Sequence, residues 1–77
     1  MEKTLHYNII LRPEDKGGFT VIVPALPGCV TYGKDLKSAR KMAKEAIELY
    51  IESLKEHNEP IPTSEGDLVS SLEITYA

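Results

Sequence analysis

The chain has 77 residues, 42% of them hydrophobic, and its nine basic and twelve acidic side chains give a net charge of −3. This length makes one small domain that buries only about 60% of its unfolded surface, and the negative charge disfavours direct binding to nucleic acid. A lone cysteine, Cys29, excludes an internal disulfide and a zinc site built on several cysteines, as is typical of the reducing cytoplasm. No apolar run approaches the roughly 20 residues that cross a bilayer. We therefore expect one cytoplasmic domain over residues 1–77, with no membrane segment.

Two strands joined by a tight turn are predicted at the start of the chain. Apolar residues alternate with others over residues 5–11, a period of two that is typical of a strand with one buried face. Pro13 ends this strand. The glycine pair at 17–18 permits a tight turn, and the alternation resumes over residues 19–23. We expect these two strands to form a hairpin.

A turn punctuated by two prolines follows, over residues 24–28. Proline has no N–H and restricts the residue before it to extended geometry, so this turn is expected to be stiff and to keep its shape without a partner. The β-branched run from Cys29 to Tyr32 predicts a third strand, which Gly33 ends.

One long helix is predicted after the third strand. Asp35 is well placed as its N-cap, and no glycine or proline occurs from Leu36 to about His57. Asn58 and Pro60 end it. The residues expected to face the sheet are Leu36, Ala39, Ala43, Ala46, Ile47, Tyr50, Ile51 and Leu54.

Alternation over residues 71–76 predicts a fourth strand at the end of the chain. The element order is then β-β-β-α-β, and a right-handed crossover lets the last strand lie parallel beside the first. The expected fold class is therefore α+β, in two layers. It has three antiparallel strands, one long helix packed on one sheet face, and a fourth strand parallel beside the first.

The residues do not indicate an enzyme, a metal site or a cofactor. Catalysis needs a nucleophile with its base, paired carboxylates or a metal cluster converging on one pocket. His6 lies in a predicted strand, and His57 lies at a helix end, where histidine complements the helix dipole. Cys29 has no histidine nearby in sequence, and a small buried hydrophobe is the simpler interpretation.

The helix has an unusual charge pattern, with lysine and arginine in its first half and glutamates in its second, both opposed to the helix dipole. Two interpretations stay open: a solvated face of mixed charge, or two copies with their helices packed antiparallel. Some apolar residues also fall outside the expected core faces. We expect them at a homodimer or higher homo-oligomer interface, although scattered surface hydrophobes are common. These residues are Ile10, Ile22, Met42 and Leu49.

Several short motifs together carry a resemblance to a known family. They are Gly17-Gly18-Phe19, the run from Val23 to Cys29, Thr31-Tyr32-Gly33, and Ala39 with Glu45-Ala46-Ile47. With these motifs the chain resembles the HicB antitoxin family and its stand-alone relatives. The resemblance implies a partly degraded RNase H-like fold. It also implies binding to a small basic ribonuclease toxin, HicA, whose catalytic histidine and RNA-binding surface such a domain masks.

The resemblance has limits that shape the expected function. Antitoxins of this family usually carry a C-terminal DNA-binding segment, and we expect none here, and hence no operator binding by this chain alone. A metal-dependent nuclease needs several carboxylates, and the first strand offers Asn8 instead of an acid. We therefore expect a non-catalytic antitoxin. A self-assembling scaffold or regulatory module without a toxin is the alternative. The residues expected to contact a partner are Pro24, Leu26, Pro27, Gly28, Glu45, Glu48 and Glu52.

Overall fold

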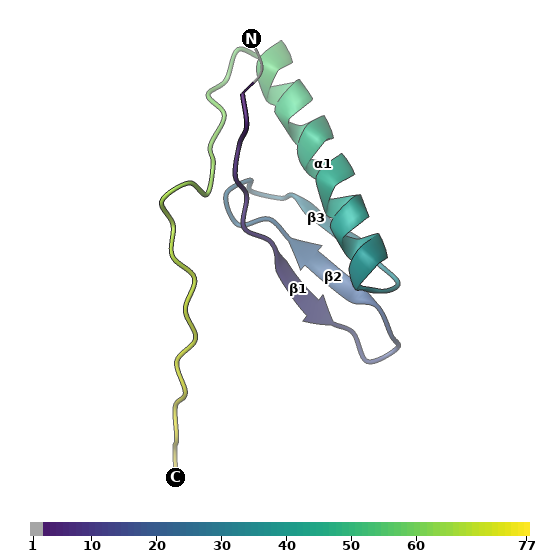
Figure 1. Cartoon of the computed structure of the whole chain (residues 1–77), viewed down its shortest axis with the longest axis vertical. Helices are drawn as coiled ribbons and strands as arrows, with labels where there is room; N and C mark the ends of the chain where they lie inside the picture. Colours follow the sequence, from purple (N-terminus) through teal and green to yellow (C-terminus); the bar gives the residue numbers. More distant parts are fainter. Residues whose placement is uncertain (1–2) are drawn as a thin grey trace.

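Three antiparallel strands and one long helix make up the fold in a computed structural model, which describes residues 3–77 (Figure 1). The elements are β1 (Ile10–Pro13), β2 (Phe19–Ile22), β3 (Val30–Gly33) and α1 (Leu36–Glu56). The strands form one sheet in the order β1-β2-β3, and both pairings are antiparallel. The predicted hairpin, third strand and long helix are therefore confirmed, but the first strand covers residues 10–13 instead of the predicted 5–11.

The strand register assigns the side chains to the two faces of the sheet. Ile10 pairs with Ile22, and Ile22 pairs with Val30, so these three residues form a row across one face. Val21 lies on the opposite face because successive residues of a strand alternate. It is completely buried against the alanines of α1. The helix therefore covers the Val21 face, and the row of Ile10, Ile22 and Val30 lies on the open face.

The start of α1 is fixed by a cap and by close packing. The Asp35 carboxylate accepts a hydrogen bond of 2.7 Å from the Ser38 backbone N–H, which confirms the predicted N-cap. Ala39 is fully buried, and it lies so close to Gly33 that a side chain at Gly33 would overlap the Ala39 backbone. Leu36 is 53% exposed. Its expected place on the core face is wrong, because it precedes the contact between Ala39 and the sheet.

A second part of the core lies beneath the proline turn, towards the end of α1. Its fully enclosed side chains are Val23, Leu26 and Cys29. Half-buried side chains pack around them from the segment before β1 and from α1: Tyr7, Ile9, Ala46, Ile47, Tyr50 and Leu54. The turn is therefore anchored from within, on the helix side of the sheet.

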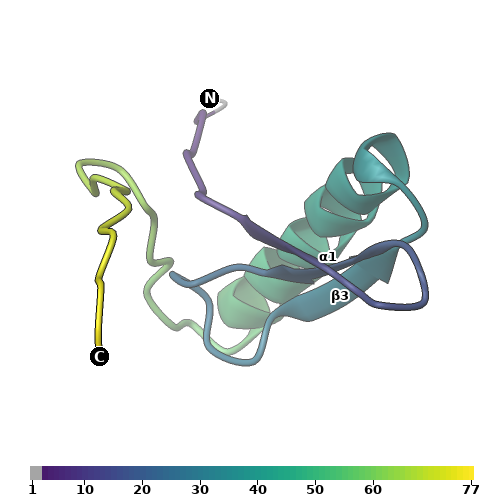
Figure 2. The same cartoon turned by 90° about the horizontal axis from the view of Figure 1, so that it is seen from below.

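The fourth strand predicted over residues 71–76 is absent from the structure, because residues 57–77 contain no helix or strand. Two residues of this segment contact the chain before β1. The Pro62 carbonyl accepts a hydrogen bond of 2.6 Å from the Tyr7 hydroxyl. The Ser64 N–H donates to the His6 carbonyl and the Ser64 hydroxyl accepts from the Asn8 N–H, both at 2.9 Å. The Ser64 carbonyl instead accepts a hydrogen bond of 2.9 Å from the Asp67 N–H. This turn redirects the chain. Residues 68–77 lead away from the sheet and the helix, and they are exposed to solvent (Figures 1 and 2).

Candidate partner-binding surface

The proline turn is closed by its own backbone and by one side chain of α1. The Val23 N–H donates to the Cys29 carbonyl at 3.0 Å, and the Cys29 N–H donates to the Leu26 carbonyl at 2.9 Å. The Tyr50 hydroxyl donates to the Pro27 carbonyl at 2.7 Å, which ties the turn to the helix. A rigid loop loses little conformational entropy when a partner binds. The turn is therefore organised before any contact.

The four predicted contact residues of the turn occupy different environments. Leu26 is fully buried and belongs to the core, so it supports the turn from beneath. Pro27 and Gly28 are exposed, and Gly28 has a φ of 80°, a left-handed conformation that glycine adopts without strain. Pro24 is exposed on another side, where it lines a cavity of about 300 Å³ together with Ile10 and other residues.

One side of α1, next to β3, combines apolar and acidic side chains. Leu49 is 67% exposed and lines a shallow cavity of about 350 Å³ together with Gly28 and other residues. Glu45 and Glu52 lie four residues before and three residues after Leu49, so they share its side of the helix. Met42 lies seven residues before Leu49 and continues the same stripe. We call Gly28, Met42, Glu45, Leu49 and Glu52 the acidic flank.

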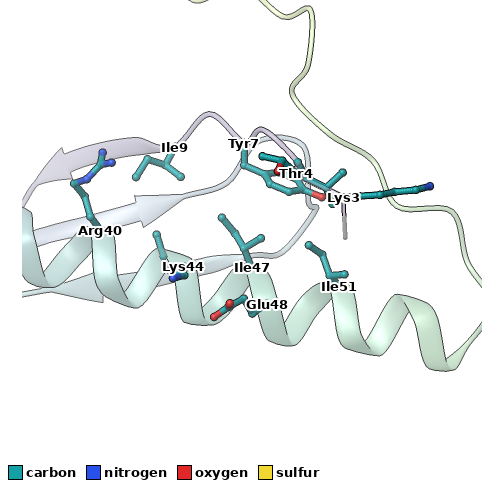
Figure 3. Close-up of a pocket in the computed structure, with 11 residues that line it drawn as sticks. Lys3, Thr4, Tyr7, Ile9, Arg40, Lys44, Ile47, Glu48 and Ile51 are labelled. Atoms are coloured by element: carbon teal, nitrogen blue, oxygen red, sulfur yellow. The ribbon is translucent and has the colours of Figure 1, made fainter. Parts of the chain in front are cut away.

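The other side of α1 faces the segment before β1 across an open groove of about 520 Å³. Ile47 points from the helix towards Tyr7 in this groove (Figure 3). Arg40 and Lys44 also line it, so these two basic residues lie away from the acidic flank. Glu48 lines the groove too, but it lies three or four residues from both glutamates of the flank and connects the two surfaces.

The four residues expected at an oligomer interface are divided between two surfaces. Ile10 and Ile22 lie on the open face of the sheet, in one row with Val30. Met42 and Leu49 lie on the acidic flank. Val30 and Leu49 line the same shallow cavity, so the two surfaces meet at the edge formed by β3.

Two titratable groups in the interior of the fold have shifted pKa values. Burial raises the pKa of the Cys29 thiol and of the Tyr7 hydroxyl, because desolvation disfavours the charged form of each group. A raised pKa makes a thiol less nucleophilic near neutral pH. Within residues 3–77, no group of three or more His, Cys, Asp or Glu side chains is placed to hold a metal ion. No helix in this range is long and apolar enough to cross a membrane.

Sequence reasoning missed how the helix separates its charges. It divided them between the two halves of α1, whereas Arg40 and Lys44 line the groove and Glu45 and Glu52 share the side of the helix that carries Leu49. The spacing of three and four residues around Leu49 was the available signal. The groove itself was missed because the predicted fourth strand was expected to lie beside β1.

Comparisons with known proteins agree on one relationship. Residues 7–74 match a family model described as the HicB-like antitoxin of bacterial toxin–antitoxin systems. A UPF0150 protein of Thermoplasma acidophilum is 47% identical over 66 residues, which cover 86% of this chain and 96% of the relative. A UPF0150 protein of Helicobacter pylori is 34% identical over 64 residues, which cover 83% of this chain and 89% of the relative.

A relative that carries the name antitoxin is matched over a smaller share of its own length. Antitoxin HicB 1 of Photorhabdus laumondii is 35% identical over 60 residues. The match covers 78% of this chain but 39% of that protein. The similarity is therefore confined to one part of the longer relative, whereas UPF0150 proteins match over most of their length.

Proposed function

This chain belongs to the HicB-like antitoxin family of bacterial toxin–antitoxin systems, and from this membership we propose that it binds and masks a small basic ribonuclease toxin of the HicA kind. The protein acts in the cytoplasm as a non-catalytic inhibitor. It covers the catalytic and RNA-binding surface of the toxin and needs no cofactor. The β-β-β-α order of its elements fits a reduced RNase H-like fold.

The acidic flank is the observation that carries this proposal. A basic toxin is attracted by Glu45 and Glu52, and charge complementarity speeds association and selects the partner. The exposed Leu49 side chain lies between these two charges, at the margin that the flank shares with the open face of the sheet. Glu48 extends the acidic row around the helix. Arg40 and Lys44 face the groove instead of the flank, and Lys41, four residues before Glu45, is the basic residue that borders the flank.

The proline turn completes the proposed contact at the end of the flank. Gly28 borders the same shallow cavity as Leu49, and Pro27 is held beside it by the hydrogen bond from Tyr50. Both residues are exposed, so their backbone is accessible to a partner. Leu26 acts from beneath by anchoring the turn, and Pro24 contributes from the β1 side.

Self-association is the second part of the proposal, and it is also the basis of the alternative function. Ile10 and Val30 are 46% and 57% exposed, and with Ile22 they form an apolar row that a lone helix on the other face does not cover. We propose that a second copy covers this row, with Met42 and Leu49 at its margin. A self-assembling scaffold or regulatory module without a toxin would use the same row.

Binding to the product of the neighbouring gene tests the antitoxin role. The two proteins are co-expressed, and the mass of any complex is measured together with ribonuclease activity. We expect a stable complex with suppressed RNA cleavage. A small basic protein with a histidine should be encoded beside this chain. Self-association with no neighbouring toxin, and no inhibition of any HicA-like ribonuclease, would favour the scaffold.

A matched pair of charge reversals tests the acidic flank. Glu45→Lys should weaken the complex by roughly tenfold or more, since a charge pair at an interface contributes about 1.5 kcal/mol or more. Glu65→Lys makes the same change in net charge at an exposed site outside the flank and should have little effect. Equal losses in both variants would indicate general charge attraction and would contradict a contact at the flank.

A further inference from the structure

The last ten residues carry an apolar pattern that nothing in the structure covers. Leu72, Ile74 and Tyr76 are between 78% and 91% exposed. They alternate with Ser71, Glu73 and Thr75, so an extended chain here has one apolar face and one polar face. This is the pattern of a strand with one buried side, and the segment needs an edge to pair with.

Within one chain, β1 ends too early to pair with the whole of residues 71–76. Ser64 bonds to His6 and Asn8 as a residue opposite position 7 of a parallel strand would, with its hydroxyl in place of its carbonyl. In that register residues 65–70 would lie opposite residues 8–13, where β1 ends. If the turn at 64–67 were instead kept out of the pairing, so that Leu68 lay opposite Asn8, residue 73 would lie opposite Pro13. Residues 74–77 would then still extend past the end of β1.

A second copy of the chain offers the matching edge without this restriction. β1 is an edge strand, since it pairs with β2 alone. The Asn8 N–H points away from β2 towards Ser64. Within β1, Ile10 and Arg12 bond to β2, in alternation with the Glu14 N–H that donates to the Gly18 carbonyl, so the backbone N–H and carbonyl of Leu11 point outward. An exposed edge of this kind is a template for pairing with another chain.

The groove beside β1 fits the apolar face of such a strand. α1 packs on β3 and β2, and the helix side of the chain leading into β1 is left as the wall of the groove. Its apolar lining comes from both sides: Leu5, Tyr7, Ile9, Ala43, Ile47 and Ile51. A strand added along β1 with Leu72, Ile74 and Tyr76 on the helix side would extend the sheet over this opening, leaving its polar side chains on the open face.

We infer that residues 68–77 of one copy form a strand on the outer edge of β1 in a second copy, and that the exchange is reciprocal. This inference rests on the self-association proposed above and adds the segment that performs it. Because each copy gives one strand and receives one, the assembly closes as a twofold dimer with no free β1 edge. The predicted fourth strand would then form between chains.

Cross-linking distinguishes exchange between copies from pairing within one chain. In a Cys29→Ala background, Arg12→Cys and Thr75→Cys are made singly, and one protein is labelled with ¹⁵N. The two are unfolded, mixed, refolded and treated with a short bis-maleimide. We expect a species of twice 8.6 kDa that joins position 12 of one copy to position 75 of the other. If the doubly substituted chain instead joins these positions only within a single chain, the inference is wrong.

A pair of neighbouring substitutions tests the role of the apolar face. Ile74→Asp places a charge on that face and should convert the dimer to a monomer, with the helix signal retained in circular dichroism. Thr75→Asp introduces the same charge on the polar face and should leave the dimer intact. A dimer that survives Ile74→Asp but is lost in Ile22→Asp would overturn the strand exchange and leave association through the open face standing. A monomeric wild-type chain would overturn both.

Discussion

The contact between Gly33 and Ala39 sets how closely α1 lies on the sheet, and Gly33→Ala tests it. Gly33 is buried, and an added Cβ would overlap the backbone nitrogen and Cα of Ala39. Because backbone atoms cannot rotate away as a side chain can, the start of α1 must move by about 1 Å to restore ordinary contact. Overpacking costs about 1–3 kcal/mol, and this site should lie at the upper end.

That cost is large for this chain. At about 0.05–0.15 kcal/mol per residue, a domain of this size has roughly 4–12 kcal/mol of stability. A loss of about 3 kcal/mol should lower the melting temperature by roughly 12–24 °C. Thermal unfolding followed by circular dichroism at one fixed protein concentration measures the change, since self-association makes the melting temperature depend on concentration.

Gly28→Ala is the matched control for this prediction. Nothing lies within 4 Å of a Cβ added at Gly28, so only its positive φ opposes the substitution. Left-handed backbone costs a residue with a side chain about 1–2 kcal/mol. We therefore expect a smaller loss of stability than in Gly33→Ala. If Gly33→Ala melts no lower than Gly28→Ala, the close packing of α1 on β3 is wrong.

Two further predictions concern the turn. Tyr50→Phe removes the hydrogen bond to the Pro27 carbonyl and should lower the free energy of unfolding in urea by about 0.5–1.5 kcal/mol. The same substitution should weaken toxin binding. An unchanged affinity would show that a loosened turn binds equally well. Burial raises the pKa of the Cys29 thiol, so the thiol should react with iodoacetamide far more slowly in the folded chain than in urea at pH 8. The same shift favours the folded state below the thiol's ordinary pKa, and stability should fall as the pH rises above roughly 8.5. In Cys29→Ala, stability should fall less as the pH rises above that value. If the thiol reacts with iodoacetamide equally fast in the folded and the unfolded chain, the burial of Cys29 is contradicted.

Local patterns predicted most of the fold. The hairpin, the Asp35 cap and the helical run to about His57 all depend on neighbouring residues, and the structure contains each of them, although the first strand begins at Ile10 instead of Leu5. The assignment of Ile10 and Ile22 to the face opposite the helix followed from a period of two in the same way.

The fourth strand could not be placed from such patterns. Alternation shows that residues 71–76 suit a strand, but whether they pair depends on an edge of sufficient length at the right distance. The turn from Ser64 to Asp67 decides this, because the Ser64 carbonyl bonds to Asp67 instead of to the chain before β1. The composition of the acidic flank was similarly hidden, since it brings together a turn and a helix that are distant in sequence.

The central claim is that the acidic flank binds a basic ribonuclease, and one titration tests it most directly. The affinity of the co-encoded toxin is measured by calorimetry for the wild type, Glu45→Lys, Glu52→Lys and the control Glu65→Lys, at low and moderate salt. We expect each flank reversal to weaken binding by roughly tenfold or more, whereas the control should stay within about threefold of the wild type. Affinity that is unchanged by both flank reversals would contradict the claim.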